Sequence, residues 1–133
     1  MPKRLKIFFD GGCRPNPGPM EAAVVARGVT HYFDDLGDGT NNDAEWLALI
    51  AALRVAQRLG VTDFVLLGDS ALVVAQANGR QRCRTPALQA HLDAFEVIGD
   101  VRTVRVRKIA RSQNLAGIAL DRRRHAAGIA RAA

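Results

Sequence analysis

Hydrophobic and polar positions change their pattern near residue 44. Before it, the apolar runs 5–10, 22–27 and 29–33 are short and bounded by glycine, proline or polar residues, which predicts three strands joined as antiparallel hairpins. Residues 44–59 contain no glycine or proline and are rich in alanine and leucine, which predicts the clearest helix of the chain.

The second half of the chain alternates strands with helices. An apolar run at 63–67 predicts a fourth strand, and valine alternating with arginine over 101–106 predicts a fifth strand at a sheet edge. Three further helices are expected at 71–77, from Thr85 or Pro86 to 98, and at 115–127. Hairpins followed by β-α crossovers predict an α/β fold, a mixed sheet flanked by helices, in a single domain over residues 1–133.

Composition is that of a globular protein. Of the 133 residues, 48% are hydrophobic and 24% are charged, which is enough for the core of one domain. No apolar run approaches the roughly 20 residues of a membrane-spanning helix, so we expect no membrane association and a cytoplasmic location. The two cysteines, Cys13 and Cys83, lack the spacing of a metal site and are expected to be free thiols.

Charge is divided unevenly along the chain. The net charge is +6, but residues 1–70 carry a net charge of −2 and residues 71–133 a net charge of +8. An acidic first half suits a bound cation, whereas clusters of arginine in the second half suit a polyanion such as nucleic acid. A basic surface that only faces water is the alternative.

Three acidic residues are expected at the ends of elements, where they could meet. Asp10 ends the first strand, Asp69 ends the fourth just before a helix, and Glu45 lies in the first turn of the long helix. If these strands are parallel neighbours, Asp10 and Asp69 lie side by side at the edge where open α/β sheets bind ligands. Clustered carboxylates repel one another unless a cation is present, and Mg²⁺ suits such ligands. Each residue also has an alternative role that needs no cation. Asp69 could simply cap its helix, and Glu45 could simply interact favourably with the helix dipole.

Segments with uncharged hydrogen-bond donors lie next to Asp10 and Glu45 in the sequence. The glycine- and proline-rich segment 11–18 offers backbone N–H groups that a ligand can approach closely, and segment 40–42 offers a small hydroxyl and two amides. Such groups can bind phosphates, sugar hydroxyls or base edges, including the 2′-hydroxyl that distinguishes RNA from DNA. Ordinary turn chemistry is the alternative for each residue.

Three segments together are similar to the motifs of one family. They are Asp10-Gly11-Gly12-Cys13-Arg14-Pro15-Asn16-Pro17-Gly18, Thr40-Asn41-Asn42-Asp43-Ala44-Glu45-Trp46 and Gly68-Asp69-Ser70, and they resemble the main motifs of type 1 ribonuclease H in order and spacing. The resemblance covers nearly the whole chain and implies a ribonuclease H-like fold with a five-stranded mixed sheet in the order 3-2-1-4-5. It also implies hydrolysis of the RNA strand of RNA–DNA hybrids with two Mg²⁺ or Mn²⁺ ions, leaving 5′-phosphate and 3′-hydroxyl ends.

The same resemblance implies roles for individual residues. It makes Asp10, Glu45 and Asp69 catalytic metal ligands. The residues expected to bind the substrate lie in the three motifs: Gly11, Gly12, Cys13, Asn16, Thr40, Asn41, Asn42 and Ser70. The expected partner is the RNA–DNA hybrid, and we expect a monomer without an obligate protein partner.

The chain departs from the family pattern at the fourth metal ligand. The pattern resembles Arg-x-x-Asn-x-x-Ala-Asp-x-Leu-Ala, and segment 111–120 fits it with Ile118 at the Asp position. Asn114, four residues earlier, and Asp121, three residues later, are the two candidate substitutes. We favour Asn114 as the fourth catalytic metal ligand, because a small shift would place its amide oxygen at the ion. A neutral ligand binds an ion weakly, so we expect lower metal affinity or a preference for Mn²⁺.

Three further features of the family are missing. Residues 108–110 are Lys, Ile and Ala, so the mobile His of many members has no counterpart, and the three histidines of the chain are expected on the surface or in the core. Segment 79–86 is too short for the basic protrusion of some bacterial members, although its arginines could supply part of the charge. The first strand begins at residue 5, so no separate N-terminal hybrid-binding domain is expected.

The sequence allows three functions. The first is a ribonuclease acting on hybrids, which the intact Asp10, Glu45 and Asp69 favour. The second is a catalytically weak nucleic-acid-binding module of the same fold, which Ile118 favours. The third is a related nuclease that acts on DNA or structured RNA.

Overall fold

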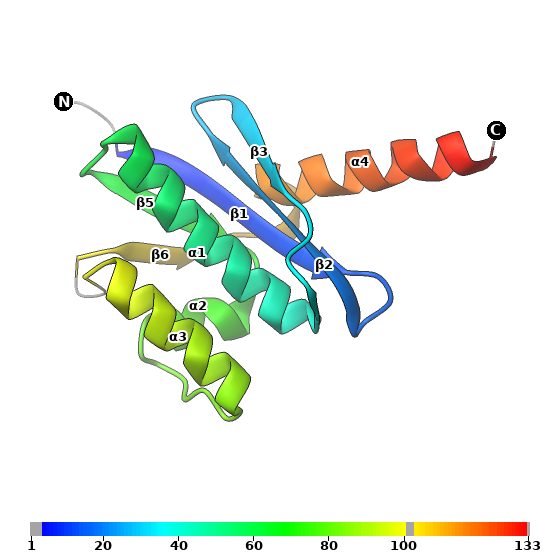
Figure 1. Cartoon of the computed structure of the whole chain (residues 1–133). Coiled ribbons are helices and arrows are strands. Elements are labelled where there is room, and N and C mark those ends of the chain that lie inside the picture. The colour runs from blue at the N-terminus through cyan, green and yellow to red at the C-terminus, as the bar shows by residue number, and fades with distance from the viewer. Residues whose placement is uncertain (1–3, 101–102, 133) are drawn as a thin grey trace.

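The centre of the structure is a mixed sheet in the order β3-β2-β1-β5-β6 (Figure 1). The computed structural model describes residues 4–100 and 103–132. Its strands are β1 (Leu5–Cys13), β2 (Gly18–Ala26), β3 (Val29–Phe33), β4 (Asp38–Gly39), β5 (Phe64–Gly68) and β6 (Arg105–Lys108). β2 is antiparallel to β1, β3 and β4, whereas β5 is parallel to β1 and β6. The short β4 aside, the predicted strand order and α/β class are confirmed.

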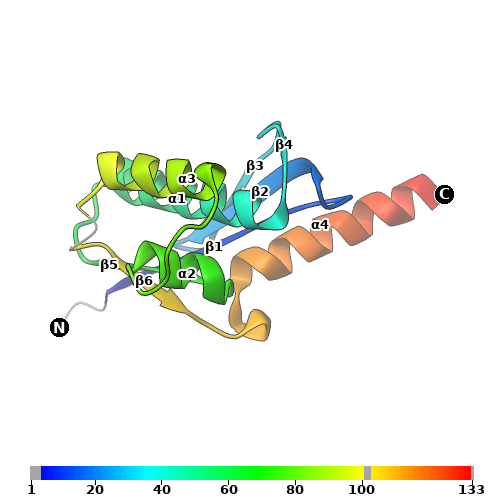
Figure 2. The same cartoon turned by 90° about the horizontal axis from the view of Figure 1, so that it is seen from below.

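Helices cover both faces of this sheet. They are α1 (Asn41–Leu59), α2 (Ala71–Ala77), α3 (Pro86–Ile98) and α4 (Leu115–Ala132), with a 3₁₀ turn, η1 (Arg111–Gln113), before the last. α1 and α3 lie together on one side of the sheet and α4 lies on the other (Figure 2). In the described ranges, no helix is both long and apolar enough to span a membrane.

Alternation along β1 assigns its side chains to the two faces. Ile7 and Phe9 are fully buried in the larger core under α1, whereas Phe8 packs with a smaller cluster under α4. In the larger core, the buried indole of Trp46 donates a hydrogen bond to Gln76 Oε1 at 2.8 Å. These contacts fix α1 against the sheet and α2, and therefore fix the position of the residue before Trp46.

The first turn of α1 has a strong cap. The Thr40 hydroxyl accepts the N–H of Asp43 at 3.2 Å, and the Asp43 carboxylate accepts the N–H of Thr40 at 3.0 Å. This reciprocal capping box satisfies two of the free N–H groups at the helix start. The helix consequently begins at Asn41, three residues before its predicted start.

β1 runs past its predicted end. The turn-like composition after Asp10 predicted a loop, but residues 11–13 pair antiparallel with residues 20–22 of β2. That prediction was wrong because ladder pairing uses backbone groups, which glycine also has, so the hairpin register continues through the motif. Asp10 therefore lies inside a strand.

The parallel pairing of β1 with β5 stops just before Asp10. Its last pair is Phe8 with Leu67, and β5 ends at Gly68. Continuing this register by two residues places Asp10 level with Asp69. Beyond Gly68, β1 has no parallel neighbour, so side chains from both layers can meet at this edge.

The last strand differs from its predicted position. β6 spans Arg105–Lys108, whereas the sequence suggested 101–106, of which residues 101 and 102 lie outside the described ranges. It pairs with β5 at the edge of the sheet, as predicted.

Gly11 lets α1 lie directly on β1. A Cβ placed on Gly11 would overlap the backbone carbonyl of Ala44, which lies on α1 and cannot move independently of it. Glycine is required here by close approach of two backbones, and this approach brings the start of α1 to the edge where β5 ends.

Gly11→Ala should therefore destabilise the protein by about 3 kcal/mol, the upper part of the range for overpacking a core. Urea unfolding, followed by circular dichroism, measures this difference. Gly128→Ala is the matched control, because a Cβ there meets no atom within 4 Å. A Gly11→Ala variant as stable as that control would contradict the close packing.

Candidate active site

The structure brings together the three acidic residues that the sequence suggested. One carboxylate oxygen each from Asp10, Glu45 and Asp69 lies within 4.8 Å of the other two. Asp10 is only 2% exposed and Glu45 only 8%, whereas Asp69 opens further to solvent. The strand register places the two aspartates, and the capped start of α1 places Glu45. Three acidic groups this close form a site of high negative potential.

Burial makes ionisation of this cluster costly. Burial, reinforced by the charges of Asp10 and Asp69, raises the pKa of Glu45 to about 10, although a hydrogen bond from Gly11 opposes the shift. Burial also raises the pKa of Asp10, against the opposing effects of its hydrogen bonds with Glu45 and Arg111. Glu45 Oε2 is buried and has no hydrogen-bond partner among the described residues. A buried carboxylate oxygen without a partner, on a residue of this acidic cluster, suits a bound cation.

Arg111 enters the site from the turn before α4. Its Nη1 donates to Asp10 Oδ1 at 2.7 Å and to Asp69 Oδ2 at 2.9 Å, and its Nη2 lies 3.3 Å from Asp121. Partial burial alone would lower the pKa of Arg111, but the hydrogen bonds to Asp69 and Asp10 raise it above its usual range. Sequence reasoning gave Arg111 no role, although it is the first residue of the pattern in which Ile118 takes the Asp position.

Asn114 is fully buried beside Asp69, with its amide nitrogen toward the carboxylates. Nδ2 donates to Asp69 Oδ2 at 2.8 Å and to the Phe9 carbonyl at 3.0 Å, while Oδ1 accepts the N–H of Ala116 at 3.2 Å. Reversing the amide would set its oxygen against the Phe9 carbonyl and its NH₂ group against an N–H, so these partners determine the orientation. In this orientation the Asn114 oxygen caps α4, so acting as a metal ligand, as the sequence suggested, would require the amide to leave these partners.

The polar residues of the first two motifs form one surface. The N–H of Cys13 donates to Asn41 Oδ1 at 3.1 Å, and the N–H of Asn41 donates to Asn16 Oδ1 at 3.2 Å. A cavity of about 700 Å³ opens beside them, and its polar lining includes Asn16, Thr40, Asn41 and Asn42. Four of the residues expected to bind the substrate thus share one cavity wall.

The other residues expected to bind the substrate have structural roles. Gly11 and Gly12 are buried within β1, where a Cβ on Gly12 would approach the guanidinium of Arg124. The Ser70 hydroxyl accepts the N–H of Val73 at 3.2 Å and caps α2. Ser70 is nevertheless adjacent to Asp69, so its cap helps to fix the direction of the chain at the site.

His91 connects α3 to the start of α1. Its Nε2 lies 2.9 Å from Asp43 Oδ1, on the carboxylate that also accepts from Thr40. Burial opposes ionisation of Asp43, but the bonds from Thr40 and His91 lower its pKa overall. Sequence reasoning missed this contact, since nothing local links two residues that are 48 positions apart.

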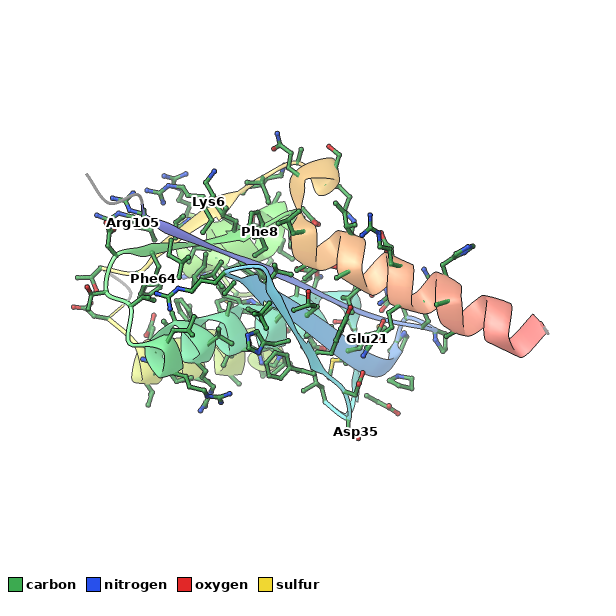
Figure 3. The ribbon with its side chains drawn as sticks, turned by 90° about the horizontal axis from the view of Figure 1, so that it is seen from above. Lys6, Phe8, Glu21, Asp35, Phe64 and Arg105 are labelled. Atoms are coloured by element: carbon green, nitrogen blue, oxygen red, sulfur yellow. The ribbon has the colours of Figure 1, made fainter. Side chains whose placement is uncertain are left out.

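Part of the basic charge on α4 is neutralised by β2. Arg123 Nη2 donates to Glu21 Oε2 at 2.8 Å, and Arg124 Nε donates to the other oxygen of Glu21. Arg123 also pairs with Asp34 at 2.7 Å. Glu21 lies beside α4, as Figure 3 shows. These pairs hold the helix against the sheet, so the arginine cluster of α4 is only partly available to a polyanion.

Comparison with other sequences connects this site to a known family. Residues 8–122 match the family described as reverse transcriptase-like. Ribonuclease HI of Halobacterium salinarum is 42% identical over 91 residues, which are 65% of this chain and 46% of that protein. The bifunctional protein Rv2228c of Mycobacterium tuberculosis is 34% identical over 118 residues, or 84% of this chain and 32% of that protein. The chain therefore spans less than half the length of these curated relatives.

Solved structures agree with these matches. The crystal structure of RNase H1 from Halobacterium salinarum has a TM-score of 0.77 and 32% identity, covering 90% of this chain and 98% of that chain. LC11-RNase H1, solved in complex with an RNA/DNA hybrid, has a TM-score of 0.73 and 32% identity, covering 84% of this chain and 89% of that chain. By motif order, strand order and similarity over most of its length, the chain belongs to the ribonuclease H family and, within it, to type 1.

Proposed function

We propose that the protein is a metal-dependent endonuclease that hydrolyses the RNA strand of RNA–DNA hybrids. The observation that carries the proposal is the approach of three carboxylates within 4.8 Å at the edge of the sheet. The donor-lined cavity beside Asn41 supports it, because neutral donors suit the phosphates and sugar hydroxyls of a nucleic acid. The similarity to ribonucleases H, one of which was solved with a hybrid, supports the choice of substrate.

The carboxylate cluster fits Mg²⁺ or Mn²⁺. Both ions prefer oxygen ligands, and the unpartnered Oε2 of Glu45 is a buried oxygen that a cation would satisfy. Asp10, Glu45 and Asp69 would together hold two such ions. When bound, such a pair supplies an activated water and stabilises the leaving oxygen of a phosphodiester.

The residues of this chain would bind and orient the hybrid. Donors on Asn16, Thr40, Asn41 and Asn42 face the cavity and would hold the backbone, leaving the scissile phosphate beside the carboxylates. Attack by water on phosphorus, with cleavage of the P–O3′ bond, gives one 5′-phosphate and one 3′-hydroxyl end. Cys13 would act through its N–H, which orients the amide of Asn41.

Asn114 would contribute by positioning Asp69. Its amide nitrogen donates to Asp69, and its oxygen is already bonded to the start of α4. Asp121, the other candidate for the fourth ligand, is exposed and contacts Arg111. We therefore assign three carboxylates to the metal site and expect weaker ion binding than four would give.

Glu45→Gln should make the stability of the metal-free protein less dependent on pH. The folded protein holds the Glu45 proton up to a pKa of about 10, against a usual value of 4.5. The folded state therefore binds more protons than the unfolded state between these values, and its stability falls as the pH rises above 4.5. Glutamine cannot ionise, so at pH 8 the variant should be more stable than the wild type by about 2 kcal/mol.

Urea unfolding in the presence of a chelator, at pH 5 and at pH 8, measures this difference. The difference in the free energy of unfolding between Glu45→Gln and the wild type should be small at pH 5 and larger at pH 8. The exposed Glu96 provides the control, since Glu96→Gln should leave the pH dependence unchanged. A difference that did not grow between pH 5 and pH 8 would show that Glu45 is already ionised at pH 5 in the metal-free site.

Asp10→Asn should abolish hydrolysis while leaving the fold intact. Asparagine keeps the size of the side chain but removes a charge that a divalent ion would need. It ends the repulsion with Asp69 and also loses the ionic partner of Arg111, so the metal-free variant should be about as stable as the wild type. Cleavage of a labelled RNA–DNA hybrid with Mg²⁺ or Mn²⁺ should fall by about 100-fold or more, the scale of losing a group that acts in the transition state. Asp93→Asn, on the exposed face of α3, should cleave like the wild type.

Three results would contradict the proposal in whole or in part. An Asp10→Asn variant that retained more than about a tenth of the wild-type rate would place the chemistry elsewhere. Wild-type protein that bound hybrids tightly but cleaved none would be a binding module of this fold. Cleavage of duplex DNA at the rate of the hybrid would contradict the substrate specificity alone.

A further inference from the structure

The guanidinium of Arg111 occupies the space between two of the carboxylates. A single nitrogen, Nη1, donates to Asp10 Oδ1 at 2.7 Å and to Asp69 Oδ2 at 2.9 Å. These two oxygens belong to the residues that would ligate a divalent ion. A guanidinium and a divalent ion repel each other, so the two cannot bind the same pair of oxygens at these distances.

The chain makes room for this guanidinium at Gly117. A Cβ on Gly117 would lie 2.6 Å from Arg111 Nη1 and 2.9 Å from its central carbon, so alanine would force the side chain to move. The next residue, Ile118, brings no carboxylate to the site. Both residues lie in the first turn of α4, and together they leave a place that suits a large planar cation.

Asp121 holds the other side of the same group. Arg111 Nη2 lies 3.3 Å from both Asp121 oxygens, one turn along α4 from Gly117. Arginine stays protonated at any working pH and presents several donors in a fixed plane, so it can bridge three carboxylates at once. The guanidinium is therefore held by Asp10 and Asp69 through Nη1 and by Asp121 through Nη2.

We propose that Arg111 is a resident cation of the carboxylate site, which a divalent ion must displace before it binds. This inference rests on the proposed function, because it takes Asp10 and Asp69 as metal ligands. Before metal binds, Arg111 offsets the repulsion between the two aspartates and stabilises the site. Displacing it costs two charge-assisted hydrogen bonds, which lowers the affinity for metal, and Asp121 retains the displaced side chain nearby.

Titration calorimetry with Mn²⁺ alone, without nucleic acid, tests this proposal. Arg111→Met removes the competing cation, and Gly117→Ala keeps the charge but displaces the guanidinium. Both variants should bind Mn²⁺ about 10-fold more tightly than the wild type, since one charge-assisted hydrogen bond is worth at least that factor. Lys108→Met is the matched control: it removes one exposed positive charge from the end of the neighbouring strand β6 and should change the affinity by about 2-fold or less.

Thermal unfolding provides a second measurement that does not depend on activity. Without metal, Arg111→Met should melt at a lower temperature than the wild type, and Mn²⁺ should raise its melting temperature by a larger amount. The proposal is overturned if neither Arg111→Met nor Gly117→Ala binds Mn²⁺ more tightly than Lys108→Met does. If Asp10→Asn binds Mn²⁺ as the wild type does, the carboxylate site itself is wrong and the proposed function fails with it.

Discussion

Repulsion among Asp10, Glu45 and Asp69 is the constraint that this site has to satisfy. The three carboxylates meet because the parallel pairing of β1 with β5 stops at Leu67 and because Gly11 lets α1 lie against β1. Neither feature relieves the charge. A protonated Glu45 and the guanidinium of Arg111 do so in the metal-free protein, and divalent ions would do so in the active one.

The scaffold around the carboxylates holds them rigidly against this repulsion. The capping box at Thr40 and the buried Trp46 fix the two ends of the first turn of α1, between which Glu45 lies. Asn114 does the same for Asp69 from the other layer of the fold. Because each carboxylate is held by an element from a different part of the chain, the site forms only when the whole domain folds.

Much of this could be predicted from sequence, because strands, helices and caps depend on local patterns. The meeting of Asp10 with Asp69 followed from one assumption, that their strands are parallel neighbours. The role of Arg111 could not be found in this way, since it contacts a carboxylate 101 residues away. The orientation of the Asn114 amide also could not be predicted from sequence, because it depends on the hydrogen-bond partners of its nitrogen and its oxygen.

The most direct test of the account is a crystal structure of the protein soaked in Mn²⁺, with the ions located by their anomalous scattering. The account predicts Mn²⁺ bound to oxygens of Asp10, Glu45 and Asp69, with the guanidinium of Arg111 moved away from Asp10. Mn²⁺ bound elsewhere, with Arg111 still between Asp10 and Asp69, would contradict it.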